Sequence, residues 1–169
     1  MSTTEDEGVP LPAGPFIGRE SFRTRVREGL SAAGRAGWRE LILCDASFED
    51  WPLGERAVVD ALEAWARGGG QRLTLLARRY DGLERRHPLF VHWRRQRAHL
   101  IECRGVPTAD ALAMPSVLWS PEWALERHEV LRSSGVCGDE AARRLRLREL
   151  LDGWLERSSP AFAASTLGL

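Results

Sequence analysis

Residues 40–45, Glu-Leu-Ile-Leu-Cys-Asp, form a short apolar run that lies between two helical patterns. Such runs are typical of strands that are buried on both faces of an α/β sheet. In these sheets, ligand sites lie at the carboxyl ends of the strands. We therefore expect residues 40–44 to form the central strand and Asp45 to lie at the edge of the sheet where a site belongs.

Helical patterns flank this strand on both sides. On the amino-terminal side, Phe22, Val26 and Leu30 recur at intervals of four residues, which predicts a helix from about residue 19 to Gly37. On the carboxyl-terminal side, a second helix is expected to begin near Pro52 and to end at the glycines of residues 68–70. The chain therefore enters and leaves its expected central strand through helices.

The same alternation continues along the chain. Residues 72–77 and 98–103 predict two more strands, and a third helix is expected to start near Pro88 between them. A short helical piece over 108–113, a strand over 116–119, a possible return strand over 123–125 and a long helix over 139–157 follow. This order predicts an α/β fold with a mostly parallel central sheet and helices on both faces. We expect a single domain over 16–169, preceded by a disordered acidic tail over 1–15.

Composition excludes several classes of protein. The three cysteines are scattered, no signal peptide is evident, and no apolar run approaches the roughly 20 residues that span a bilayer. We therefore expect a cytoplasmic protein without membrane contact. His99 and Cys103 share one face of an expected strand, but two ligands do not make a metal site, and we predict no metal and no cofactor.

The charges are balanced overall but unevenly placed. All 24 cations are arginines, and 24 acids oppose them. Residues 67–104 carry 10 arginines and 3 acids, which gives this segment a net charge of +7. The absence of lysine excludes Schiff-base and other lysine chemistry.

The chain resembles one half of the phospholipase D-like fold, in particular small bacterial proteins that keep the half-domain without its catalytic motif. The resemblance covers about residues 19–165. It rests on the order of elements and on residues 150–158, Leu-Leu-Asp-Gly-Trp-Leu-Glu-Arg-Ser. It implies a phospholipase D-like half-domain whose relatives work as two halves that face each other, so a lone half is expected to form a homodimer or to bind another protein.

Active members of that family carry a His-x-Lys-x4-Asp motif in each half, in which histidine attacks phosphorus and lysine neutralises the phosphoryl oxygens. The resemblance places Ala113, Pro115 and Ser120 at the histidine, lysine and aspartate positions. None of the three has the required chemistry. The resemblance therefore implies a pseudoenzyme without catalytic residues. We interpret His87, His92 and His128 as packing or surface residues.

The arginine-rich segment is the feature that can bind a ligand. Arg78, Arg79 and Arg104 follow or end expected strands at the same edge as Asp45 and Ser47, which predicts an anion site formed by these five residues. The arginines of the third helix offer a surface to nucleic acid. The other interpretation is a solvated helix face whose arginines pair with the acidic first third of the chain, and the neutral overall charge favours it.

Three hypotheses on function follow. The first is a non-catalytic protein-interaction or scaffold module. The second is a phosphate-binding or nucleic-acid-binding protein that uses residues 67–104. The third is an enzyme with rebuilt chemistry around Cys44, Asp45 and Cys103, which would need the first and third strands to be neighbours. We rank them in this order.

Overall fold

The computed structural model describes residues 9–164 of the chain. One eight-stranded sheet runs through it, in the order β1-β7-β6-β5-β2-β3-β4-β8. The strands are β1 (Gly14–Phe16), β2 (Glu40–Cys44), β3 (Arg72–Ala77), β4 (Ile101–Gly105), β5 (Ser116–Trp119), β6 (Ala124–Glu129), β7 (Ser134–Gly138) and β8 (Ser159–Pro160). The helices are α1 (Arg19–Ala36), α2 (Arg56–Ala66), α3 (Asp81–Arg86), α4 (Pro88–Gln96), the short 3-10 helix η1 (Ala98–Leu100) and α5 (Ala141–Arg157).

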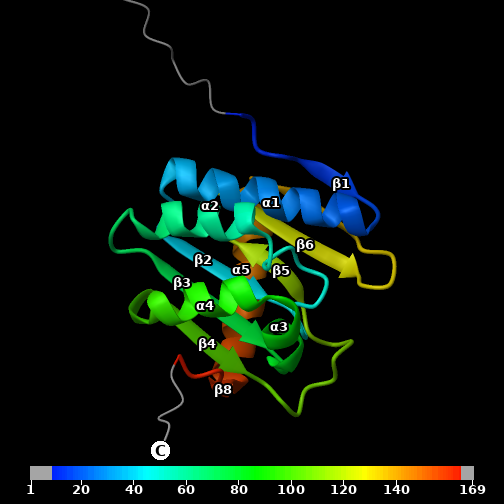
Figure 1. Ribbon diagram of the computed structural model, residues 1–169. Coiled ribbons are helices and arrows are strands. Elements are labelled where there is room, and N and C mark those ends of the chain that lie inside the picture. The colour runs from blue at the N-terminus through cyan, green and yellow to red at the C-terminus, as the bar shows by residue number, and fades with distance from the viewer. Residues whose placement is uncertain (1–8, 165–169) are drawn as a thin grey trace, which may run out of the picture.

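The expected α/β class is confirmed, and helices cover both faces of the sheet. Helices α1 to α4 lie on one face and α5 lies on the other (Figure 1). The strands expected over 40–44, 72–77 and 116–119 are present, and the return strand expected at 123–125 is β6. None of the helices in the described part of the chain is long and apolar enough to cross a bilayer.

The expectation of a mostly parallel sheet is wrong. Only the pairs β2/β3 and β3/β4 are parallel, and the other five pairs are antiparallel. The reason lies in residues 106–115, which connect β4 to β5 through turns and contain no helix. A parallel connection needs a crossover of a dozen or more residues, so this shorter connection returns the chain antiparallel from the same edge.

The central position of β2 follows from its residues. Its neighbours are β3 and β5, with Leu43 opposite both Leu75 and Leu118. Leu41 and Leu43 enter the larger core beneath α1 to α4, whereas Ile42 and Cys44 enter the smaller core beneath α5. Because side chains alternate between the faces of a strand, the four apolar residues 41–44 of β2 supply both cores.

Several helix boundaries differ from the expected ones. Helix α2 begins at Arg56, and Pro52 lies in the turn before it. The expected third helix is two helices, because α3 ends before His87 and α4 starts at Pro88, which has no N–H to continue a preceding helix. The residues expected as helix over 108–113 form turns. The strand expected at residue 98 begins at Ile101, after η1.

Three strands, β1, β7 and β8, were not expected from the sequence. Residues 14 and 15 were assigned to the acidic tail, but together with Phe16 they form β1 and pair with β7, so ordered structure begins before the expected boundary at residue 15. Residues 1–8 of that expected tail lie outside the described part of the chain. Strand β7 contains Gly135, where an added Cβ would lie 2.0 Å from the Glu126 carbonyl oxygen. Close approach of β6 and β7 therefore requires glycine at this position.

Candidate functional site

A buried ion pair lies at the carboxyl end of β2. The Arg127 Nη2 atom, from β6, donates a hydrogen bond of 3.0 Å to Asp45 Oδ1. The two side chains are only 1% and 7% exposed. The other Asp45 oxygen accepts hydrogen bonds from the backbone N–H groups of Ser47 and Phe48, at 3.1 and 2.8 Å. Both oxygens of the carboxylate are therefore occupied.

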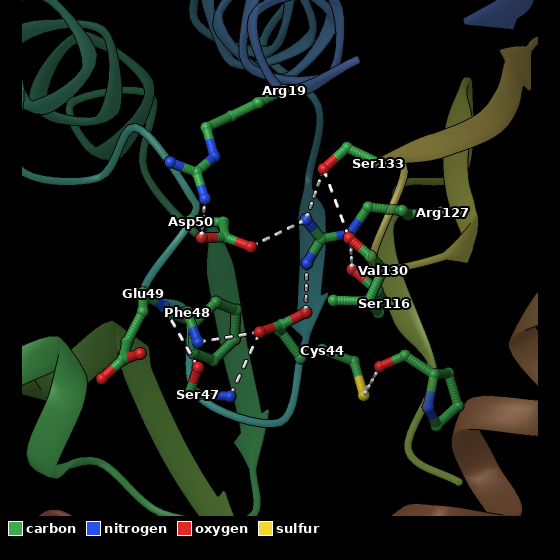
Figure 2. A network of polar contacts seen from close by, with 12 residues as sticks. Arg19, Cys44, Ser47, Phe48, Glu49, Asp50, Ser116, Arg127, Val130 and Ser133 are labelled. Atoms are coloured by element: carbon green, nitrogen blue, oxygen red, sulfur yellow. Dashed lines mark hydrogen bonds and ion pairs between the residues drawn. The ribbon is translucent and has the colours of Figure 1, made fainter. Parts of the chain in front are cut away.

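The remaining donors of Arg127 are also used. Nε donates to Ser116 Oγ at 3.1 Å, and Nη1 lies 3.4 Å from both Ser133 Oγ and Asp50 Oδ2. Figure 2 shows the guanidinium of Arg127 among Ser116, Ser133 and Asp50. The guanidinium also stacks over the Phe22 ring, 4.2 Å from its centroid. This edge of the sheet thus holds a closed network in which each charge has a partner.

Arg127 is the residue of this edge that the sequence reasoning missed. It lies in Glu-Arg-His-Glu, residues 126–129, which looks like a polar surface segment. Two signals pointed to it. Asp45 follows a fully apolar strand and is therefore buried, so it needs a cationic partner. On β6, Arg127 also shares the alternation of Leu125, whose side chain is fully buried.

The five residues of the expected anion site are not gathered in one crevice. Asp45 and Ser47 belong to the Arg127 network. Arg104 turns away from them, because its Nε and Nη2 atoms donate to the side-chain and backbone oxygens of Ser158 at 2.9 and 2.8 Å. The expectation of a single five-residue crevice is therefore corrected.

Arg78 and Arg79 remain together. Both line a surface groove of about 480 Å³ between the start of α3 and residues 159–162. The Arg78 Nε atom donates to the Ala109 carbonyl oxygen at 2.8 Å, whereas the Arg79 side chain is exposed. Asp81 and Glu84 also line the groove. Anion binding by Arg78 and Arg79 stays a prediction, and both residues line this groove.

The three positions given by the family motif lie around β5. Ala113 is exposed in the turn that precedes the strand, and the Pro115 carbonyl oxygen accepts a hydrogen bond from the Cys44 thiol at 3.3 Å. Ser120 is buried after the strand. Its Oγ donates to the Trp123 carbonyl oxygen and accepts from the Trp123 N–H, so it closes the turn into β6. The three residues therefore belong to the connections on either side of β5.

The cysteine-centred enzyme hypothesis fails on geometry. β2 and β4 are separated by β3, and Cys44 and Cys103 belong to the cores on opposite faces of the sheet. Burial raises the pKa of Cys44 well above its usual value and that of Cys103 to about 11. His99 lies in η1 and not on a strand beside Cys103. Residues 9–164 contain no group of three or more His, Cys, Asp or Glu that could hold a metal ion.

The arginine-rich segment divides into paired and unpaired side chains. Arg67 and Arg97 pair with Glu63, and Arg85 pairs with Glu49 at 3.3 Å, so part of the segment does bind the acidic first third of the chain. The Arg97 guanidinium lowers the pKa of Glu63 by direct hydrogen bonding. Within residues 67–104, the arginines that are exposed and have no ion pair in the described part of the chain are Arg72, Arg79, Arg86 and Arg95.

Comparison with solved structures gives a parallel for the fold. No known protein family matches the chain, and no curated protein does. Among solved structures, the chain is similar to TrmBL2, an archaeal chromatin protein whose structure shows a novel mode of DNA binding. The TM-score is 0.65 at 16% sequence identity, and the match covers 93% of this chain and 57% of TrmBL2. The likeness shows the fold, and this chain spans little more than half the length of that protein.

Proposed function

We propose that this protein binds nucleic acid through the phosphate backbone of the nucleic acid, and that the contacts come from an arginine surface formed by α3, α4 and the loop before α3. We define that surface as Arg79 in the loop, Arg85 and Arg86 in α3 and Arg95 in α4. The observation that carries the proposal is that Arg79, Arg86 and Arg95 are exposed without an ion pair in the described part of the chain. Guanidinium groups left free in this way are suited to phosphate oxygens.

Local charge supports the proposal. Residues 78–97 hold seven arginines against two acids, Asp81 and Glu84, although the whole chain is neutral. Arg85 is 74% exposed and meets Glu49 through one contact, so a phosphate can compete for it. Phosphate contacts of this kind supply affinity without sequence preference. The DNA binding named for TrmBL2 is in keeping with the proposal.

We also propose that the domain is a degenerate phospholipase D-like half. Helix α1, strands β2 and β3 and residues 150–158, which carry that resemblance, support this proposal, and the network around Arg127 fills the edge of the sheet with paired charges. Ala113, Pro115 and Ser120 supply no nucleophile or phosphate clamp. Binding without hydrolysis is the behaviour that this arrangement supports.

Fluorescence anisotropy with a labelled oligonucleotide tests the main proposal. Binding should weaken steeply between about 50 and 200 mM salt, since counterions are released when arginines neutralise phosphates. The triple variant Arg79→Gln, Arg86→Gln, Arg95→Gln should lower the slope of log affinity against log salt by about 2 to 3. Single-stranded and duplex probes of equal length show which form is preferred.

A charge-matched triple variant provides the control. Arg19, Arg132 and Arg146 are 63, 77 and 55% exposed, and each already has an acidic partner. Their replacement by Gln removes the same formal charge from other parts of the surface. An equal loss of binding in both triple variants would show that only total charge matters, and the arginine surface would then lose its assigned role.

A second candidate function is self-association, and one apolar patch favours it. Ile17, Val130 and Leu131 are 75, 43 and 94% exposed. They are neighbours, because the Gly18 N–H donates to the Arg132 carbonyl oxygen at 3.1 Å. We propose that a second copy of the chain covers this patch, as the expected homodimer requires. Light scattering should find a dimer that Leu131→Asp converts to a monomer. A monomeric parent protein at high micromolar concentration would exclude this.

A further inference from the structure

Residues 159–162 form a short strap across the carboxyl half of β4. Ser159 and Pro160 pair with Gly105 and Arg104, and the Ala161 N–H donates to the Cys103 carbonyl oxygen at 3.0 Å. The strap lies close to β4, since a Cβ added at Gly105 would be 2.9 Å from Ala161 Cβ. Its regular pairing ends within two residues. A few backbone hydrogen bonds therefore hold the segment in place.

Phe162 is the residue of the strap whose side chain packs on Tyr80. Its ring stacks on Tyr80, with centroids 5.0 Å apart and an angle of 6° between the planes. Its φ is +46°, in the left-handed region that a bulky residue rarely adopts. The stacked position is thus reached with a strained backbone.

Tyr80 is a fixed platform for that ring. Its hydroxyl lies 2.7 Å from the Arg104 carbonyl oxygen and 3.1 Å from the Leu75 carbonyl oxygen, so β3 and β4 position the hydroxyl end of the side chain. Burial raises the pKa of Tyr80 well above its usual value, so the hydroxyl remains a donor. Aromatic rings held in this way accept another flat ring by stacking.

Beneath the strap lies a cation with unused donors. Arg94 is 5% exposed, and its Nε and Nη1 atoms have no hydrogen-bond partner. Its Nη2 atom donates to the Phe162 carbonyl oxygen at 3.2 Å, and the guanidinium also lies beside the Cys103 thiol, which is a weak acceptor. The guanidinium lies 6.0 Å from the centre of the Phe162 ring. A buried guanidinium normally has most of its five donors satisfied, so Arg94 is suited to bind a group that carries several acceptor oxygens.

We propose that the strap occupies a nucleotide site, and that a base of single-stranded nucleic acid displaces Phe162 from Tyr80 while a phosphate takes the donors of Arg94. This rests on the proposed function and names where the bound strand enters the fold. The groove of about 480 Å³ beside the strap leads to this point and brings Arg78 and Arg79 within its lining. The phosphates on either side of the stacked base then run along these arginines.

The acidic residues of the groove have a place in the same arrangement. Asp81 and Glu84 line it together with Tyr80. Carboxylates repel phosphate but accept hydrogen bonds from the exocyclic amino groups of bases. A cytosine or adenine on Tyr80 is therefore favoured over a thymine.

The variant Phe162→Ala removes the aromatic ring of the strap and keeps its backbone. Removing an internal competitor raises the fraction of molecules with an open site, so we expect affinity for a single-stranded oligonucleotide of C and A to rise about tenfold. Adding Arg94→Gln or Tyr80→Leu to Phe162→Ala should reverse the gain. Leu145→Ala, which removes an exposed apolar side chain from α5 on the other face of the sheet, should leave affinity unchanged. Thermal melting of every variant shows which ones remain folded.

A second readout needs no substitution. Tyr80 is the one tyrosine of the chain, so protein labelled with ¹³C-tyrosine gives a single set of ring signals in NMR spectra. Exchange of Phe162 for a base changes the ring current at Tyr80. The unmodified protein should therefore show a shift of these signals when the oligonucleotide is added.

The outcomes separate this inference from the proposed function. Salt-dependent binding that requires Arg79, Arg86 and Arg95, with no change in Phe162→Ala and no shift at Tyr80, would overturn the strap site and leave the arginine surface standing. Binding by Phe162→Ala alone would support the site and show that the parent chain keeps it closed. Absence of binding in both proteins would overturn both proposals.

Discussion

Arg127 and Asp45 are 82 residues apart in the sequence, and their side chains meet at 3.0 Å in the interior. The pair joins β2 to β6 across the intervening strand β5, whose Ser116 Oγ accepts a hydrogen bond from Arg127. One guanidinium thus ties together three neighbouring strands at the edge of the sheet. The contact also sets the turn after β2, because Asp45 accepts the N–H groups of Ser47 and Phe48.

Arg127→Met should destabilise the protein by about 3–5 kcal/mol, because it leaves the Asp45 carboxylate buried without its cation. Urea unfolding followed by circular dichroism measures this loss. The double variant with Asp45→Asn should lose less than the sum of the two single variants, since the charges are removed together. Additive losses would mean that the two groups are not coupled.

Gly153→Ala should stabilise the protein by about 0.5–1 kcal/mol, because Gly153 lies within α5 and alanine favours a helix. An added Cβ there has nothing within 4 Å. Gly135→Ala is the matched opposite, since its Cβ would meet the Glu126 carbonyl oxygen, and a loss of about 3 kcal/mol is expected. Thermal melting of the two variants beside the parent protein compares them. Similar behaviour of both would contradict the close approach of β6 and β7.

The stability of the protein should depend on His87 in acid. Burial lowers the pKa of His87 below its usual 6.5, and its Nε2 atom lies 2.8 Å from the Phe48 carbonyl oxygen. The unfolded chain therefore takes up this proton at a higher pH than the folded protein does. The contribution of neutral His87 is fully present above about pH 6.5 and is lost as the pH falls through the lowered pKa.

His87→Gln should accordingly lose less stability than the parent protein between about pH 7 and pH 5. Urea midpoints at the two pH values give the difference. His92→Gln is the control, because His92 is exposed and should follow the parent profile. Parallel profiles for all three proteins would show that His87 does not titrate with unfolding.

The three thiols should be unreactive in the folded protein. Cys44, Cys103 and Cys137 are free and buried, and burial raises the pKa of each. Because the thiolate is the reactive form, a disulfide reagent at mild alkaline pH should modify them slowly until denaturant is added. Absorbance of the released thiol follows the reaction. Fast labelling of Cys44 in the native state would revive cysteine chemistry beside Asp45.

The sequence predicts the elements that have strong periodicity. The apolar run at residues 40–44 and the four-residue spacing of Phe22, Val26 and Leu30 give β2 and α1 correctly, because burial on both faces or on one stripe leaves a plain pattern. Strand β1 has three residues beside prolines, and β7 reads Ser-Gly-Val-Cys-Gly. Neither sequence is apolar enough to predict a strand, because both segments become strands through pairing with other strands of the folded sheet.

The direction of the strands and the ion-pair network around Arg127 could not be predicted from the local sequence pattern. Sheet direction depends on where the connection over residues 106–115 leads, and its length of ten residues, too short for a parallel crossover, was the available signal. Arg127 and Arg94 lie on elements that otherwise look like charged surface, yet both are buried. A charged side chain is buried only where a residue distant in the sequence supplies an ion-pair partner, as Asp45 does for Arg127. The local sequence does not identify such partners.

The sheet ends in very short strands on both sides, with three residues in β1 and two in β8. Each covers a longer strand whose outward N–H and C=O groups would otherwise be free to pair with another molecule. Removal of either terminal segment would therefore expose a ready template for edge-to-edge assembly. Strands β1 and β8 therefore protect the sheet from aggregation. We expect a form of the protein that lacks either strand to form fibrils or amorphous precipitate.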